Sequence, residues 1–192
     1  MNYKKIYDDL YNRGYNKNTE KKNPTNLIAY LKNIKPSLTI IDVGAGTGYL
    51  VDTINKETIH LAIGLEISPV AVEKSKHRLE KTNAAFFKVY LGSILDMPFP
   101  NNFADMCISC DVLEHLHPTH VLRAASELHR VAPKQLHQIC TRLDTLPWKK
   151  LTPLKNLHLS VFPIHQWASF LDCHTLDNQT ITNLPKNELI PN

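Results

Sequence analysis

The chain has 192 residues, a length that fits one domain with a single hydrophobic core. Its composition, 43% hydrophobic and 21% charged, is that of an ordinary globular protein and excludes disordered, collagen-like and fibrous classes. No apolar run is long enough to cross a bilayer, and the polar N-terminus lacks the apolar stretch of a signal peptide. We therefore expect a cytoplasmic protein with no membrane partner.

The net charge of +4 is concentrated near the N-terminus. The first 35 residues contain eight Lys or Arg against three Asp or Glu, a net charge of +5, which leaves −1 for the rest of the chain. Scattered lysines are typical of a solvated surface rather than of a nucleic-acid footprint. The charge pattern therefore argues against nucleic acid as a partner.

The four cysteines include one CxxC pair, Cys107 and Cys110. This pair lies in a predicted strand, where a spacing of three places the two thiols on opposite faces. No second pair has metal-ligand spacing, so the sequence favours free thiols over a zinc or redox site.

Helical and β-branched segments alternate along the chain. Leucine and isoleucine recur at helical spacing in residues 23–34, and residues 38–43 form a short β-branched run that predicts a buried strand. The further predicted elements, in chain order, are a helix over 47–55, a strand over 59–67, a helix over 69–82, strands over 84–91 and 104–110, a helix over 118–132, a strand over 136–143 and a helix over 163–171. This alternation predicts an α/β fold, a mostly parallel sheet between two layers of helices, with ligands at the carboxyl ends of the strands.

Three of the six glycines, Gly44, Gly46 and Gly48, directly follow the first predicted strand. Glycine costs backbone entropy, and such a cluster suits a sharp turn into a helix where a ligand touches bare backbone and unpaired N–H groups. A dinucleotide-binding GxGxxG would need glycine at position 49, which is Tyr49, and no GK[ST] ending marks a P-loop. The pattern is instead DxGxGxG, beginning at Asp42.

From residue 38 to 132 the sequence resembles the class I S-adenosylmethionine-dependent methyltransferases. The resemblance rests on DVGAGTG at 42–48, GLEISP at 64–69 and GSILDMPFPNNFADMCISCDVLEHL at 92–116. It implies a Rossmann-like three-layer αβα sandwich that binds S-adenosylmethionine and releases S-adenosylhomocysteine. The residues that it assigns to the cofactor are Asp42, Gly44, Ala45, Gly46, Gly48, Glu66, Ile67, Ser93, Ile94 and Cys110.

Within that set, the resemblance gives particular residues a role. The glycine loop lies beneath the methionine part of the cofactor, and Glu66 accepts hydrogen bonds from both ribose hydroxyls, as an acceptor-only carboxylate can. Ser93 stands where the family commonly has an acidic residue facing the adenine amino group, so Ile94 is expected to hold the ring and Asp96 to substitute for the missing carboxylate. The Cys110 main chain meets the methionyl end.

The segment DVLEHLHP supplies the candidate catalytic residues, His115 and Asp111. An imidazole titrates near neutral pH, so His115 is the expected base for a hydroxyl acceptor. If the stretch is helical, Asp111, Glu114 and His115 share a face, and His158 would complete a divalent-cation site for an ion such as magnesium. This resembles the cluster of ubiquinone-pathway O-methyltransferases and small-RNA 3′-terminal methyltransferases, but Asp replaces the first Glu. Capping and surface roles for the carboxylates are favoured over a metal site.

The last 50 residues resemble the family poorly. KQLHQICTRL at 134–143 replaces its glycine turn and apolar fifth strand, and the tail after Cys173 predicts at most one weak strand. We expect a sheet that is truncated at its C-terminal strands or completed by a partner subunit.

We expect a single methyltransferase domain over 1–192, with an N-terminal helical cap over 1–35, a cofactor-binding core over 36–145, and acceptor-side and C-terminal elements over 146–192. The favoured function is O-methylation of a small molecule such as a sugar or other metabolite, in a homo- or hetero-oligomer. Two alternatives stay open: a metal-assisted O-methyltransferase acting on an RNA 3′ end or a quinone precursor, and a non-catalytic cofactor-binding partner subunit.

Overall fold

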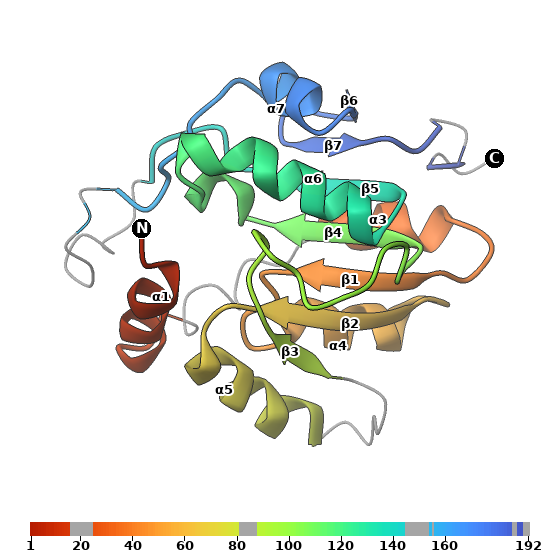
Figure 1. Ribbon diagram of the computed structural model, residues 1–192. Coiled ribbons are helices and arrows are strands. Elements are labelled where there is room, and N and C mark those ends of the chain that lie inside the picture. Colours follow the sequence, from red (N-terminus) through yellow and green to blue (C-terminus); the bar gives the residue numbers. More distant parts are fainter. Residues whose placement is uncertain (16–24, 81–87, 145–153, 155, 186–187, 190–192) are drawn as a thin grey trace.

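The computed structural model describes residues 1–15, 25–80, 88–144, 154, 156–185 and 188–189. Within these residues a seven-stranded sheet has the order β3-β2-β1-β4-β5-β7-β6, with helices on both faces (Figure 1). The strands are β1 (Thr39–Val43), β2 (Leu61–Glu66), β3 (Val89–Leu91), β4 (Met106–Cys110), β5 (Lys134–Gln138), β6 (His174–Thr175) and β7 (Thr180–Thr182). The helices are α1 (Tyr3–Asn12), α3 (Thr25–Asn33), α4 (Tyr49–Glu57), α5 (Pro69–Glu80), α6 (Val121–Val131) and α7 (Ile164–Phe170), with short 3₁₀ turns η1 (Leu113–His115) and η2 (Pro118–His120).

Alternate residues of the central strands enter two separate cores. Ile41 of β1 and Cys107 of β4 pack in one core with α6 and α7, whereas Ile40 and Ile108 pack in the other with α3 and α4. Strands β1 to β5 pair in parallel, and β7 runs antiparallel to both β5 and β6. The prediction of a three-layer αβα sandwich with a mostly parallel sheet is confirmed. All four cysteines lie in the described part of the chain and are free thiols.

The C-terminal strands differ from the prediction. A truncated sheet was expected, but β7 pairs with β5 in the register Leu136↔Thr182 and Gln138↔Thr180, and β6 completes the edge. Strand β5 spans Lys134–Gln138, so it starts two residues and ends five residues before the predicted strand at 136–143. The sheet is therefore complete within this chain.

Polar side chains inside β5 explain why its sequence lacks the apolar pattern expected of a central strand. The Gln135 amide donates to the carbonyls of Leu128 and Ala132 at 3.1 and 2.6 Å, and the His137 ring bonds the Ser109 hydroxyl and the Gln135 side chain at 2.9 and 3.0 Å. Buried polar groups are tolerated when they are hydrogen-bonded in this way. A central strand can then carry glutamine and histidine in place of the usual apolar run.

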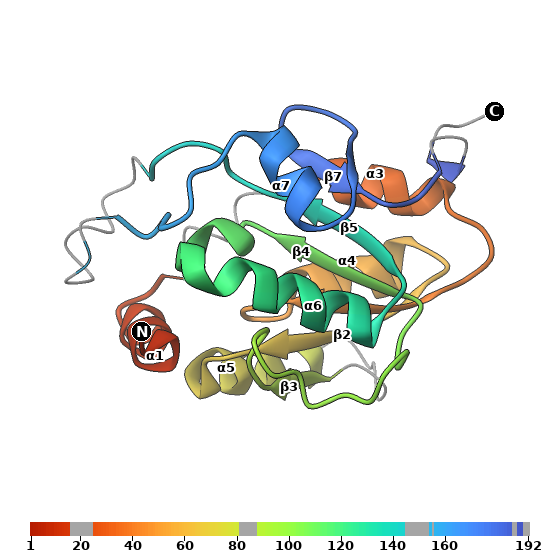
Figure 2. The same cartoon turned by 45° about the horizontal axis from the view of Figure 1, so that its top comes forward.

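Helix α1 was not among the predicted elements, because the expected opening helix was placed at 23–34. That helix is α3, which begins at Thr25, and residues 23–24 lie outside the described part. Residues 81–87 also lie outside it. They include the end of the predicted helix over 69–82 and the start of the predicted strand over 84–91. The Asn2 side chain caps α1 by accepting a hydrogen bond from the Lys5 amide at 3.0 Å. Both views place α1 at the end of the sheet to which the arrows of β1, β2 and β4 point (Figures 1 and 2). None of the described helices is long and apolar enough to span a bilayer.

The buried His137 makes the stability of the fold depend on pH. Burial lowers the pKa of the His137 imidazole to about 3 from its ordinary value of 6.5, so the folded state keeps it neutral where the unfolded chain takes up a proton. The stability that it contributes is complete above about pH 6.5 and is lost as the pH falls toward about pH 3. We expect His137→Gln to flatten this acid dependence, measured as the difference in urea-unfolding free energy between variant and wild type across that range. An unchanged slope would contradict the assignment.

Candidate functional site

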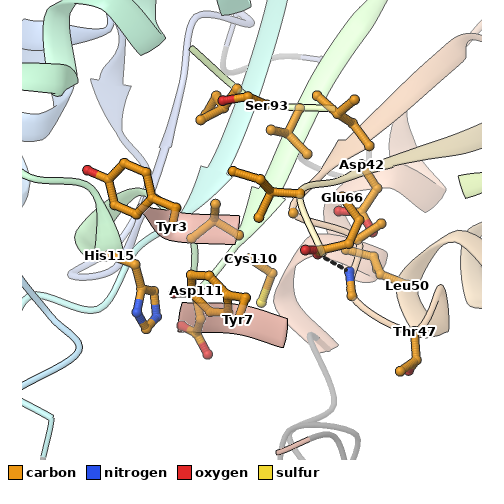
Figure 3. A pocket seen from close by; sticks show the side chains of 18 of the residues that line it. Tyr3, Tyr7, Asp42, Thr47, Leu50, Glu66, Ser93, Cys110, Asp111 and His115 are labelled. Carbon is orange, nitrogen blue, oxygen red and sulfur yellow. Dashed lines mark hydrogen bonds between the residues drawn. The ribbon is translucent and has the colours of Figure 1, made fainter. Parts of the chain in front are cut away.

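A cavity of about 220 Å³ lies at the carboxyl ends of the strands, where the sheet order reverses between β1 and β4 (Figure 3). Ligands of open α/β sheets bind at this switch point. The cavity is lined by the loops after β1, β2, β3 and β4, by α1 with the following Tyr15, and by Asp144 and His158 beyond β5. The predicted cofactor residues that line it are Asp42, Gly44, Ala45, Gly46, Glu66, Ile67, Ser93, Ile94 and Cys110. The predicted catalytic residues Asp111 and His115 line it too.

The loop after β1 turns on glycines in the left-handed region. Gly44 and Gly46 have φ of +78° and +56°, conformations that residues with a side chain rarely adopt. The Gly44 and Ala45 amides donate to the Leu65 carbonyl at 2.7 and 3.0 Å, which fixes the loop against β2. A Cβ on Gly46 would lie 2.8 Å from the Tyr11 hydroxyl, so this backbone is closely covered by α1. Gly48 does not line the cavity; it is the left-handed N-cap of α4, with φ +77°.

Glu66 at the end of β2 is held by backbone donors. Its Oε2 accepts from the Gly46 amide at 2.9 Å and its Oε1 from the Ser68 amide at 2.8 Å. Burial raises the pKa of this carboxyl, and the bonds from Ser68 and Gly46 oppose the shift. A carboxylate has about four acceptor positions, more than the backbone donors of Ser68, Gly46 and Ile67 fill. The side chain is thus oriented in advance and retains capacity to accept from a ligand hydroxyl.

A second buried carboxyl, Asp42, lies on the floor of the cavity beside Glu66. Burial, with the Glu66 charge as a smaller cause, raises the pKa of Asp42 to about 7. Two neighbouring carboxyls in a confined site favour a ligand that brings hydrogen-bond donors or positive charge. They disfavour an anion.

The face of α1 toward the cavity is made of tyrosines that the sequence analysis missed. Tyr3, Tyr7, Tyr11 and Tyr15 recur every four residues, and all four line the cavity. In α1 this spacing places Tyr3, Tyr7 and Tyr11 on one side of the helix, and Tyr15 lies in the turn that follows Asn12. The repeat was a readable signal. Tyr7 meets Tyr15 edge-on with ring centroids 6.3 Å apart, and Tyr11 meets Tyr15 in the same way at 5.5 Å.

Side-chain hydrogen bonds of Asp8 and Tyr3 hold α1 against the rest of the fold. The Ser68 hydroxyl donates to the Asp8 carboxylate at 2.6 Å, next to the Glu66 site. At the other end of the helix, the Tyr3 hydroxyl accepts from the His117 amide at 2.7 Å and bonds the His120 ring at 2.8 Å. The tyrosine face therefore sits over the cavity from the glycine loop to the loop after β4.

The loop after β4 does not form the α-helical face that was expected. Asp111 is left-handed, with φ +54°, and only residues Leu113–His115 form a 3₁₀ turn. Glu114 points inward and is fully buried, where its Oε1 accepts from the Cys140 amide at 3.0 Å. Asp111 and Glu114 consequently do not share a face, because the chain turns sharply between the strand and the short helix.

A smaller set of the predicted metal ligands does come together. The ligand atoms of Glu114, His115 and His158 all lie within 4.8 Å of one another, and the two imidazole rings meet edge-on at 5.0 Å. Asp111 is not part of this group, although it lines the same cavity with His115, His158 and Asp144.

Comparison with known proteins agrees with this geometry. The family model for the methyltransferase domain matches residues 41–135, which include the glycine loop, Glu66 and the loop after β4. An uncharacterized methyltransferase of Schizosaccharomyces pombe is 33% identical over 125 residues, which are 60% of this chain and 44% of the relative. The chain belongs to the class I S-adenosylmethionine-dependent methyltransferases. It spans less than half the length of the curated relatives that it matches.

Solved structures with the same fold are more distant in sequence. A chain of the complex between the Haloferax volcanii Trm112 methyltransferase activator and a methyltransferase matches with a TM-score of 0.70 at 15% identity, over 89% of this chain and 77% of that one. The PH0226 protein of Pyrococcus horikoshii matches with a TM-score of 0.64 at 14% identity, over 94% of this chain and 92% of that one. At these identities the likeness concerns the fold.

The loop after β3 departs from one expectation. Ser93 and Ile94 line the cavity, but Asp96 does not; its amide donates to the Ser93 carbonyl at 3.1 Å and closes a turn. Asp96 is therefore not placed to substitute for the acidic residue that the family commonly has at position 93.

The close approach of Tyr11 to Gly46 can be tested by a pair of substitutions. We expect Gly46→Ala to destabilise the fold by about 1–2 kcal/mol from the left-handed conformation alone, with an added cost from the contact with the Tyr11 hydroxyl. Tyr11→Phe removes that oxygen, so the double variant should be more stable than the sum of the single effects predicts. Thermal or urea unfolding of the four proteins measures the coupling; additivity within about 0.5 kcal/mol would mean that α1 does not cover this loop.

Proposed function

We propose that the chain is an S-adenosylmethionine-dependent methyltransferase that acts on a hydroxyl group of a small molecule. The observation that carries the proposal is a single cavity with the glycine loop and Glu66 at one end and His115 at the other. When bound, the cofactor supplies an electrophilic methyl group on a sulfonium. The protein's contribution is to align two reactants and to accept a proton.

The cofactor end fits the adenosyl and methionyl groups by its donors and acceptors. Glu66 is an acceptor-only carboxylate placed to accept from the ribose hydroxyls. Gly44 and Gly46 supply the left-handed turn of the loop that lines the methionyl end. Ser93 and Ile94 line the part of the cavity that we assign to the adenine, and Cys110 lines the part that we assign to the cofactor end nearest the acceptor.

The acceptor end places a base beside the cavity. His115 is mostly buried and lines the cavity with Tyr7, whose ring lies 6.1 Å from the imidazole. An imidazole there accepts the proton of the attacking hydroxyl and passes it to water. Because α1 roofs the cavity, the acceptor is a small molecule, such as a sugar or other metabolite, rather than a nucleic acid.

The assembly is a separate proposal. The seven-stranded sheet, complete within the described residues, removes the structural reason for a non-catalytic half of a heterodimer. A solved neighbour of the same fold is a complex with a methyltransferase activator, which supports a hetero-oligomer in which this chain is the catalytic subunit.

Calorimetry tests the cofactor assignment without knowledge of the acceptor. We expect S-adenosylmethionine and S-adenosylhomocysteine to bind with micromolar-class affinity, at least tenfold more weakly after Glu66→Ala, and NAD not to bind. Glu73→Ala, an exposed carboxylate on α5, is the matched control and should bind like wild type. Affinity that is unaffected by the loss of Glu66 would show that the ribose assignment is wrong.

A second candidate is a metal-assisted O-methyltransferase, favoured by the cluster of Glu114, His115 and His158. The ligand atoms of one tetrahedral ion lie about 3–4 Å apart, and those of this cluster all lie within 4.8 Å of one another. Two imidazoles and one carboxylate suit manganese or zinc better than magnesium, which prefers oxygen ligands. Such an ion would orient the acceptor hydroxyl and lower its pKa.

Metal binding is tested on the protein alone. If the cluster is a metal site, Mn²⁺ or Zn²⁺ should bind one per chain in calorimetry, and Glu114→Gln or His158→Ala should weaken binding at least tenfold. The control is His165→Ala, an exposed imidazole on α7. Binding that none of the cluster variants changes would eliminate this candidate.

A further inference from the structure

The loop between β3 and β4 forms one wall of the cavity. Gly92, Ser93 and Ile94 at its start line the cavity, where Figure 3 shows Ser93. The loop folds back on this start, since a Cβ on Gly92 would lie 2.6 Å from Leu65 Cδ1 and 2.9 Å from Pro98 Cδ. The position of the lining residues therefore depends on how the rest of the loop is held.

A tight turn joins Ser93 to the part of the loop that contacts α6. The Leu95 amide donates to the Ser93 hydroxyl at 3.1 Å, and the Asp96 amide donates to the Ser93 carbonyl at 3.1 Å. On the other side of the turn, the Leu95 carbonyl accepts from Arg123 Nε of α6 at 2.7 Å. A shift of the loop relative to α6 would therefore move Ser93 as well.

Two further side chains of α6 hold the middle of the loop through its main chain. The Glu127 carboxylate accepts from the Met97 amide at 2.7 Å. The Arg130 guanidinium donates to the Met97 carbonyl at 3.1 Å and to the Phe99 carbonyl at 2.7 Å. It also donates to both carboxylate oxygens of Glu127, at 2.7 and 2.8 Å. A planar guanidinium presents its donors in fixed directions, so this one side chain orders the carboxylate and two loop carbonyls together.

The Glu127–Arg130 pair has a counterpart elsewhere on the surface that lacks these loop contacts. The hydrogen bond from Arg130 lowers the pKa of the Glu127 carboxyl, so the pair is charged at neutral pH. Helix α5 carries an ion pair with the same spacing, Glu73 and Lys76, at 2.6 Å, and both of its side chains are exposed. Exposed ion pairs contribute little to stability. The feature that distinguishes the α6 pair is its set of bonds to the main chain of a loop that lines the cavity.

From these contacts we infer that Glu127 and Arg130 are positioning residues for the base of the cofactor, because they fix the start of the loop after β3 where it meets the adenine. The inference rests on the proposed function, which assigns this part of the cavity to the adenine. Neither side chain lines the cavity, so both act through the loop. Asp96 does not line the cavity either, so this loop presents the base with main-chain groups, Ser93 and Ile94 rather than with a carboxylate.

Two ligands that differ only in the base test the inference: S-adenosylhomocysteine and S-inosylhomocysteine, in which a carbonyl oxygen replaces the amino group. The replacement exchanges donor and acceptor on that edge of the base, so a fixed loop distinguishes the two. We expect wild type to bind the adenine compound at least about tenfold more tightly in calorimetry. In Arg130→Gln this ratio should fall below about threefold, because the affinity for the adenine compound drops while that for the inosine compound changes less than about twofold.

Either of two results would overturn the inference. One is a wild type that does not distinguish the two bases. The other is an Arg130→Gln protein that keeps a ratio of about threefold or more, including one that loses affinity for both ligands equally, as a merely structural defect would cause.

A conservative variant separates positioning from ion pairing. Arg130→Lys keeps the positive charge, but an ammonium does not reproduce the fork that spans the Met97 and Phe99 carbonyls. It should therefore lose the base preference as Arg130→Gln does. Lys76→Gln removes the same charge from the exposed pair with Glu73 and should bind both ligands like wild type. Full preference in Arg130→Lys would show that charge alone suffices and would contradict the assignment.

Hydrogen exchange measures the contact between loop and α6 without a ligand. In Arg130→Gln the Met97 amide and its loop neighbours should exchange at least about tenfold faster than in wild type, whereas amides of β1 should keep their wild-type rates and so report an intact fold. Unchanged exchange in the loop would overturn the inference. If S-adenosylhomocysteine does not bind wild type, the proposed function fails, and the exchange rates still decide whether the pair holds the loop.

Discussion

The hydrogen bond from the Gly46 amide to the Glu66 carboxylate joins the ends of β1 and β2 across the floor of the cavity. A buried carboxylate is costly unless donors surround it, and here the loop after β1 supplies one and Ser68 supplies the other. The donor is available only because Gly44 and Gly46 accept left-handed backbone. The shape of the glycine loop and the orientation of Glu66 therefore depend on each other, and the ligand cavity is formed where they meet.

Helix α1 extends this constraint to the end of the cavity at His115. Ten residues are too few for a stable isolated helix, so its order depends on packing and on the bonds of Asp8 and Tyr3 to the rest of the fold. Its tyrosine face covers Gly46 at one end and His115 at the other. A ligand that fills the cavity contacts α1 and the loops at once, so binding and the docking of α1 reinforce each other.

The acidic lining limits the chemistry that this cavity accepts. A sulfonium cofactor brings positive charge to a site where Asp42 and Glu66 are buried carboxyls, and the pKa of Asp42 is raised to about 7 because burial disfavours its anion. Charge complementarity at short range in a confined site outweighs the positive net charge of the chain, which is screened at its surface.

The sequence alone determined the parallel core, the left-handed glycine turn and the place of Glu66, because each depends on local pattern: β-branched runs, helical spacing and the order of one strand–helix–strand unit. The tyrosine repeat of α1 was equally readable, but the sequence alone does not show which surface of the fold these tyrosines pack against. Only the tertiary structure decided that Glu114 turns inward to the Cys140 amide while Asp111 faces the cavity, that polar β5 is a central strand, and that β6 and β7 complete the sheet. Those outcomes depend on partners distant in sequence, whose hydrogen bonds compensate for burial and override the local preference of each segment.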